Sequence, residues 1–237
     1  MRPLAILQAR MSSSRLPGKV MRPLLGEPMI GRQIERLRLA ERLGPILVAT
    51  SEDPGDDPLV AYVESLGVAV YRGSLHDVLD RFHGALEGHA AGPHFLRLTA
   101  DCPLADPALI DLSIEVHLNS GADYTHTSPG WTFPKGLDVE VCTVAALNAA
   151  WAETADPYDR EHVTPFIYRR PERFKVEQIT RDPPLRYRWT VDTPEDFAFV
   201  ADVYEALYPA NPAFTSQDIL AWQARHPDRV IPNLVEA

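Results

Sequence analysis

The sequence predicts an α/β protein built on a mostly parallel open sheet with helices on both faces. Short apolar runs alternate with longer amphipathic stretches five times between residues 4 and 126, and this rhythm is typical of parallel strands joined by crossover helices. The connections are short, and no internal repeat, low-complexity tract or obvious linker divides the 237 residues. We therefore expect a single domain over residues 1–237.

The elements of the first half follow from hydrophobic periodicity. Leu4–Gln8 and Pro45–Thr50 are short apolar runs of the kind that form buried strands. Asp57–Leu66 begins with acidic residues and a proline, which favour the first turn of a helix. The other expected strands are Val68–Tyr71, His94–Thr99 and Ala122–His126, and the other expected helices are Ile30–Leu43, Leu75–Leu86 and Pro107–Asn119.

The alternation changes after His126. A Pro-Gly turn within Ser128–Thr132 precedes Phe133–Thr143, whose second half alternates like a strand. This pattern predicts a small β-hairpin arm over residues 128–142 that leaves the main sheet, either for dimer contacts or to cover a site. The remaining expected elements are the strands Phe174–Ile179 and Arg186–Val191 and the helices Val144–Trp151, Arg160–Tyr168, Pro194–Leu207 and Ser216–Ala224.

Charge is distributed unevenly along the chain. The net charge of −10 argues against a nucleic-acid partner. Residues 1–42 nevertheless carry a net charge of +6, and the remainder carries −16, so we expect a small polyanion bound at one place. Arg32, Arg36, Arg38 and Arg42 are interpreted as the solvated face of a helix and not as part of that site.

Composition indicates the compartment. No apolar run approaches the roughly 20 residues of a membrane span, so we expect no membrane partner. Only two cysteines are present, which favours the reducing cytoplasm over a disulfide framework.

The loop Gln8–Lys19 follows the first expected strand and contains small residues with three cations. Small side chains let backbone N–H groups approach an anion, and Arg10, Arg15 and Lys19 supply positive charge. The common mononucleotide P-loop is excluded, because it requires glycine in place of Ser13 and serine or threonine in place of Val20. A different phosphate-binding loop is predicted.

Two aspartates follow other expected strands. Ligands of open α/β sheets bind beyond the carboxyl ends of the strands, where Asp101 and Asp192 fall. Two carboxylates near a cationic phosphate-binding loop are explained if a Mg²⁺ ion bridges them and the phosphates. Mg²⁺ prefers hard oxygen ligands and also binds phosphate. Asp101 could instead belong only to a turn, and Asp192 only to a helix start capped by Thr193.

Two further clusters are candidates for substrate contacts. On a strand, Asp138 and Glu140 share one face and follow Lys135 closely. His162 is either a structural histidine or a polar contact to substrate. No nucleophile elbow or zinc-binding spacing occurs, which disfavours covalent catalysis.

These residues carry a resemblance to a known family. The segment Ala9–Lys19 resembles the CMP-sugar synthetase motif A-R-x-x-S-x-R-L-P-G-K, and LTADCPLADP and VDTPEDF resemble the segments that supply metal-binding aspartates in that family. FPKGLDVEV and REHVTPFIYRRPERF resemble the branch named for spore coat polysaccharide biosynthesis protein F. The resemblance covers residues 3–207 and implies a Rossmann-like nucleotide-diphospho-sugar transferase fold.

The resemblance implies a reaction and a set of roles. The reaction is transfer of CMP from CTP to an acidic keto sugar for surface polysaccharide, with release of pyrophosphate, by a cytoplasmic homodimer. Arg10, Lys19 and Asp101 are implied as catalytic, and Asp101 and Asp192 as ligands of Mg²⁺. The residues implied to contact CTP are Ala9, Arg10, Ser13, Arg15 and Lys19 at the phosphates and Arg97 and Thr99 at the base, while Lys135, Asp138, Glu140 and His162 are implied to face the sugar.

Two other functions are compatible with the fold class. A glycosyltransferase of related fold would consume a nucleotide sugar, but it usually carries a D-x-D-like motif after a central strand, where this chain has Asp101-Cys102-Pro103. A non-catalytic nucleotide-sugar-binding subunit would be expected to lose Lys19 or one of the two aspartates, and all three are present.

Overall fold

The computed structural model describes residues 2–89, 92–128, 132–229 and 231. Its seven-stranded sheet has the order β5-β4-β1-β6-β8-β7-β9, and within it only β8 is antiparallel to its neighbours. The strands are β1 (Leu4–Gln8), β4 (Ile46–Ser51), β5 (Ala69–Gly73), β6 (His94–Thr99), β7 (Tyr124–His126), β8 (Glu140–Thr143) and β9 (Val176–Gln178). The mostly parallel open sheet is confirmed.

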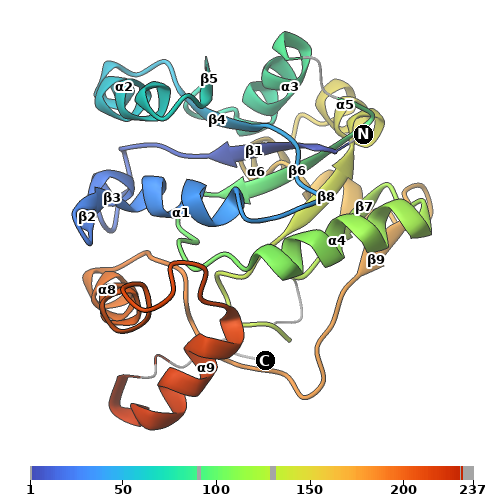
Figure 1. Cartoon of the computed structure of the whole chain (residues 1–237). Coiled ribbons are helices and arrows are strands. Elements are labelled where there is room, and N and C mark those ends of the chain that lie inside the picture. The colour runs from blue at the N-terminus through green and yellow to red at the C-terminus, as the bar shows by residue number, and fades with distance from the viewer. Residues whose placement is uncertain (1, 90–91, 129–131, 230, 232–237) are drawn as a thin grey trace.

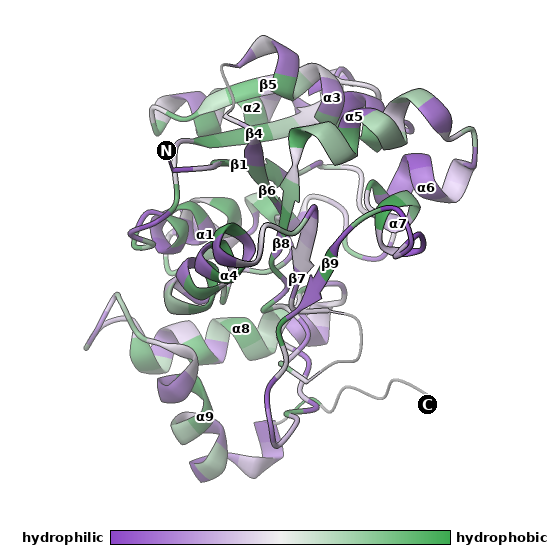
Figure 2. Ribbon diagram, turned by 90° about the vertical axis from the view of Figure 1, so that its right-hand side faces the viewer, coloured by the Kyte–Doolittle hydropathy of each residue, from purple (hydrophilic) through white to green (hydrophobic). Residues whose placement is uncertain are grey.

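Helices cover both faces of this sheet (Figures 1 and 2). The helices are α1 (Met29–Leu37), α2 (Asp57–Ser65), α3 (Val78–Gly88), α4 (Pro107–Ser120), α5 (Val144–Glu153), α6 (Pro157–His162), α7 (Pro165–Tyr168), α8 (Pro194–Leu207) and α9 (Ser216–Arg225). Alternating residues of β1 enter two separate cores, because successive strand side chains point to opposite faces. Ala5 and Leu7 pack with α1, α4 and α8, whereas Leu4 and Ile6 pack with α3 and α5. No helix within the described residues is long and apolar enough to cross a membrane.

The expected hairpin arm over residues 128–142 is wrong in its second half. Glu140–Thr143 forms β8, which pairs with both β6 and β7 inside the main sheet. Residues 129–131 lie outside the described part of the chain. A small hairpin does occur elsewhere, between β2 (Pro23–Leu24) and β3 (Glu27–Pro28), where Leu25 and Gly26 both have positive φ, as a tight two-residue turn requires.

Two other expected elements are absent or divided in the structure. Arg186–Val191 is not a strand of the sheet, and its Arg188 forms an isolated parallel bridge with Lys135. The expected helix Arg160–Tyr168 is divided into α6 and α7 at Val163, which has a φ of +72°. Pro165 follows two residues later and disfavours a continuous helix across this point.

The interpretation of four arginines as a solvated face is wrong for two of them. Arg38 and Arg42 are exposed, but Arg32 and Arg36 are buried. Arg32 donates to the carbonyl oxygens of Leu24 and Leu25. Arg36 donates to those of Ala105 and Phe214, so it joins α1 to segments far away in the sequence.

Buried His117 and its partly buried neighbour His94 make the stability of this fold sensitive to pH. His94 Nδ1 lies 3.0 Å from His117 Nε2, and His117 Nδ1 lies 3.0 Å from the Thr125 hydroxyl. Burial, and next the neighbouring His94, lower the pKa of His117 to about 4, and burial also lowers the pKa of His94. The His117 ring is therefore neutral in the folded protein near pH 6, where it begins to gain a proton in the unfolded chain.

We expect the free energy of unfolding to fall as the pH is lowered from about 6.5 towards 4, by about 2 to 3 kcal/mol for His117. Urea unfolding at pH 7.5 and pH 5 measures this change. His117→Gln should be less stable at pH 7.5 but should show a smaller difference between the two pH values. An equal change in the free energy of unfolding between the two pH values in the parent and the variant would show that this pair does not cause the pH dependence.

Candidate active site

A cavity of about 540 Å³ opens at the carboxyl ends of β1 and β6. Its wall is formed by the loop after β1, the end of β6, the start of α3 and one face of α6. The lining residues are Gln8, Ala9, Arg10, Ser13, Ser14, Arg15, Lys19, Val20, Leu75, His76, Val78, Arg97, Thr99, Ala100, Asp101, Pro157, Glu161, His162 and Asp192. All of the residues expected to bind CTP or metal are thereby brought together.

The loop after β1 is held in a compact shape by its own backbone and by Asp56. The N–H groups of Ser13 and Gly18 both donate to the Met11 carbonyl oxygen at 2.9 Å. Gly18 has a φ of +69°, a left-handed conformation that glycine adopts without strain. The Met11 N–H donates to buried Asp56 at 2.7 Å. Burial would raise the pKa of Asp56, but hydrogen bonds from Ser51, Met11 and Thr50 outweigh it and lower the pKa.

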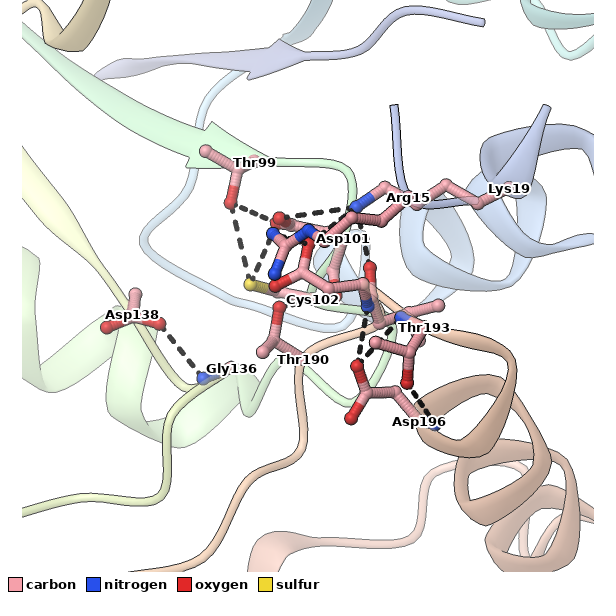
Figure 3. A network of polar contacts seen from close by, with 12 residues as sticks. Arg15, Lys19, Thr99, Asp101, Cys102, Gly136, Asp138, Thr190, Thr193 and Asp196 are labelled. Carbon is pink, nitrogen blue, oxygen red and sulfur yellow. Dashed lines mark hydrogen bonds and ion pairs between the residues drawn. The ribbon is translucent and has the colours of Figure 1, made fainter. Parts of the chain in front are cut away.

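Lys19 is buried at the centre of the site (Figure 3). Its ammonium donates to the Val191 carbonyl oxygen at 2.6 Å and to Asp192 Oδ1 at 3.1 Å, and it lies 3.6 Å from Asp101 Oδ2. The three polar contacts match the three donors of an ammonium group. Lys19 therefore links the two predicted metal-binding aspartates.

Asp192 is surrounded by cations. Besides Lys19, Arg15 lies 3.0 Å from its Oδ1 and Arg188 lies 2.8 Å from its Oδ2. Burial alone would raise the pKa of Asp192, yet Lys19 and then Arg15 outweigh it and hold the pKa below its ordinary value. The next residue, Thr193, caps α8, so the Asp192 side chain is not needed for the cap and pairs with the cations of the site.

Asp101 lies in the turn that follows β6. The Thr99 hydroxyl donates to its Oδ1 at 2.6 Å, and the Asp101 side chain is 29% exposed, against 10% for Asp192. The neighbouring thiol of Cys102 is buried, and burial raises its pKa well above the ordinary value, which keeps it protonated and unreactive.

The described residues contain no group of three or more His, Cys, Asp or Glu side chains placed to hold a metal ion. Asp101 and Asp192 instead form a pair that shares one ammonium. Such a pair fits Mg²⁺, which often takes one or two protein carboxylates and completes its shell with phosphate oxygens and water.

The two residues expected at the base are engaged with other protein groups. Arg97 pairs with Glu140 across β6 and β8. Burial would lower the pKa of Arg97, but Glu140 reverses this effect and the pKa is raised. The Thr99 hydroxyl is used by Asp101. Both residues line the cavity, but their strongest polar contacts are internal.

The residues expected at the sugar are not all brought to the cavity. His162 lines it, whereas Lys135, Asp138 and Glu140 do not. Glu140 accepts hydrogen bonds from Tyr124 and Thr164 in addition to Arg97. Asp138 accepts from the Ser128 hydroxyl and the Gly136 N–H, and burial nevertheless raises its pKa.

Sequence reasoning missed several residues of the site. Arg188 lies four residues before Asp192 and contacts both Asp192 and Asp196. Because Arg188 lies on an irregular segment, no helical or strand periodicity predicts that its side chain faces Asp192. Glu161 and His76 line the cavity, and Glu161 was recognisable only as a neighbour of His162.

Comparisons with known proteins identify the family of this chain. The sequence pattern of a family described as cytidylyltransferase matches residues 4–211. Spore coat polysaccharide biosynthesis protein SpsF of Bacillus subtilis is 34% identical over 95% of both chains. An uncharacterized protein of Methanocaldococcus jannaschii is 40% identical over 83% of this chain and 81% of its own length.

Solved structures resemble the whole fold. A cytidylyltransferase from Leptospira borgpetersenii serovar Hardjo-bovis superposes with a TM-score of 0.92 at 29% identity, over 100% of this chain and 99% of that one. A CMP:2-keto-3-deoxy-manno-octonic acid synthetase in complex with CTP shares the fold, with a TM-score of 0.62 at 16% identity over 85% and 98% of the two chains. Because the family pattern spans most of the sequence and the Bacillus subtilis relative matches nearly end to end, the chain belongs to the cytidylyltransferase family.

Proposed function

We propose that this cytidylyltransferase transfers CMP from CTP to the hydroxyl of an acidic keto sugar and releases pyrophosphate. The observation that carries the proposal is the contact of the Lys19 ammonium with Asp101 and Asp192 beside the basic loop of Arg10 and Arg15. A cavity with this distribution of charge suits a triphosphate and a divalent cation bound together.

The reaction forms one bond and breaks one. The sugar oxygen bonds to the α-phosphorus of CTP, the bond from that phosphorus to the bridging oxygen breaks, and pyrophosphate leaves with the electron pair. Catalysis then consists of positioning and charge neutralisation. Arg10 is suited to the phosphates, because its exposed guanidinium lines the cavity and forms no hydrogen bond or ion pair with the described residues. Arg15 is mostly exposed and can turn from Asp192 towards the same ligand.

Asp101 and Asp192 are proposed to hold Mg²⁺. When bound, the ion would neutralise charge on the phosphate oxygens. Asp101 is the more accessible of the two and, among the described residues, forms an ion pair with Lys19 alone, whereas Asp192 is shared among Lys19, Arg15 and Arg188. We therefore infer that Asp101 is the principal protein ligand and that Asp192 mainly fixes the surrounding cations.

The proposed acceptor follows from relatives. Besides SpsF, a cytidylyltransferase for 8-amino-3,8-dideoxy-manno-octulosonate from Shewanella amazonensis is 32% identical over 53% of this chain. Those names point to acidic keto sugars and to surface polysaccharide. Glu161 and His162 line the same cavity from α6, and their polar side chains are proposed to bind sugar hydroxyls.

The test of this function is pyrophosphate release from CTP, Mg²⁺ and a panel of eight-carbon and nine-carbon keto-acid sugars, with the other nucleoside triphosphates and with neutral hexoses as controls. We expect release with CTP and at least one keto-acid sugar, and loss of release when EDTA is added. No release with any pair would exclude the proposed reaction, and release unaffected by EDTA would exclude the role of Mg²⁺.

We further propose that the enzyme is a cytoplasmic homodimer. Two cysteines that are both free and buried fit the reducing cytoplasm. The homodimer implied by the family resemblance stays a prediction, which light scattering coupled to size-exclusion chromatography measures.

A further inference from the structure

Arg81 of α3 is a buried cation with few partners. Only 1% of its surface is exposed. One guanidinium nitrogen donates to the Ser74 carbonyl oxygen at 2.9 Å, and its buried Nε has no hydrogen-bond partner. Among residues 2–89, 92–128, 132–229 and 231, no carboxylate forms an ion pair with it. Burial of a charge without a paired counter-ion is unfavourable in a folded protein.

The position of Arg81 relates it to the cavity. Val78 lies one turn earlier on α3 and lines the cavity, as do Leu75 and His76. Long helical side chains point towards the N-terminal end of their helix, and the contact with Ser74 shows that Arg81 does so. Arg81 itself is not among the lining residues, but its guanidinium contacts Ser74, which directly precedes the lining residue Leu75.

The charges around Arg81 are mainly repulsive. Burial, and next the charge of Arg10, lower the pKa of Arg81 to about 10, and Arg97 contributes further repulsion. At neutral pH all three guanidinium groups are charged. Asp56 attracts Arg81, but its oxygens already accept hydrogen bonds from Met11, Thr50 and Ser51. The wall of the cavity next to Arg10 therefore has more positive charge than its internal contacts neutralise.

We propose that Arg81 is a positioning residue for the nucleotide: its buried, unpaired charge strengthens binding of the phosphate chain of CTP without touching it. This inference rests on the proposed function in taking CTP as the ligand. The field of a cation behind a low-dielectric wall reaches into the cavity with little screening. The same charge that destabilises the free protein is then stabilised when the polyanion binds.

This role predicts opposite effects on stability and affinity. Arg81→Met retains an unbranched apolar side chain and removes the charge. We expect the melting temperature of the ligand-free variant to rise, while Kd for CTP and for inorganic tripolyphosphate increases about tenfold. Kd for cytidine, which has no phosphate, should stay unchanged. Arg81→Lys keeps a positive charge and should bind CTP within about threefold of the parent.

Arg36→Met is the matched control, because Arg36 is also buried but donates to Ala105 and Phe214 and does not line the cavity. It should lower the melting temperature and leave the affinity for CTP unchanged. Isothermal titration calorimetry and thermal unfolding measure all of these quantities without an acceptor sugar. Failure of the parent to release pyrophosphate would therefore count against the proposed reaction alone.

Three results would overturn the role of Arg81. A lower melting temperature of Arg81→Met, or its failure to fold, would show that the guanidinium is structural. An unchanged affinity for CTP and tripolyphosphate would show that its charge does not reach the ligand. An equal loss of affinity for CTP and cytidine would show that the substitution changes the shape of the cavity.

Discussion

Lys19→Ala is expected to lower kcat/KM for CTP by about a thousandfold or more, the largest effect we predict for a cation of the site. The ammonium contacts Val191, Asp192 and Asp101. Its removal leaves two neighbouring carboxylates without the cation that they share. It also removes a fixed positive charge next to the proposed path of the leaving pyrophosphate. Pre-organised charge of this kind acts more strongly in the transition state than in the ground state.

The loss should appear mainly in kcat, and steady-state kinetics with pyrophosphate detection measures it. Lys19→Met retains the apolar stem of the side chain but lacks the charge. A similar loss of kcat/KM in this variant would show that the charge, and not the packing of the stem, is responsible. Lys175→Ala is the matched control, because Lys175 is exposed and donates to the Ser120 carbonyl oxygen on α4. If Lys19→Ala folded normally and kept more than about a tenth of the parent kcat/KM, the central role of Lys19 would be wrong.

The sequence was sufficient to predict where the site lies. Strands β1 and β6 are parallel neighbours, so the loop after β1 and Asp101 after β6 must meet at one edge of the sheet. Asp192 also lies at this edge, but it does not follow a strand of the sheet as predicted. The expected strand before it is absent from the sheet, and the two segments are joined by hydrogen bonds from the Val191 N–H and the Thr190 hydroxyl to the Asp101 carbonyl oxygen.

Side-chain burial and direction were harder to predict. Arg36 has the spacing of a solvated helix face, but Ala105 and Phe214 provide acceptors from distant segments. Glu140 occupies the predicted strand, yet antiparallel pairing of β8 with β6 sets it opposite Arg97, and it does not line the cavity. Both outcomes depend on partners far away in the sequence, which periodicity along one segment does not report.

Asp101→Asn is expected to reduce kcat about a thousandfold and to raise the Mg²⁺ concentration needed for half-maximal activity. Asparagine keeps the shape of the side chain and an acceptor for the Thr99 hydroxyl, while it removes the charge that a divalent cation requires. Because Asp101 is partly exposed and faces one cation, the melting temperature should change little.

Asp192→Asn provides the sharpest comparison with Asp101→Asn. Asp192 is mostly buried and contacts Lys19, Arg15 and Arg188, so its neutralisation leaves several cations uncompensated and should lower the melting temperature as well as kcat. Asp111→Asn is the control, since Asp111 only accepts from the backbone of Glu41 and Arg42 at the surface. Mg²⁺ titrations of all three variants decide the assignment. An Asp101→Asn enzyme with the parent's Mg²⁺ dependence would show that Asp101 is not the principal ligand, because loss of a direct carboxylate ligand necessarily weakens binding of the ion.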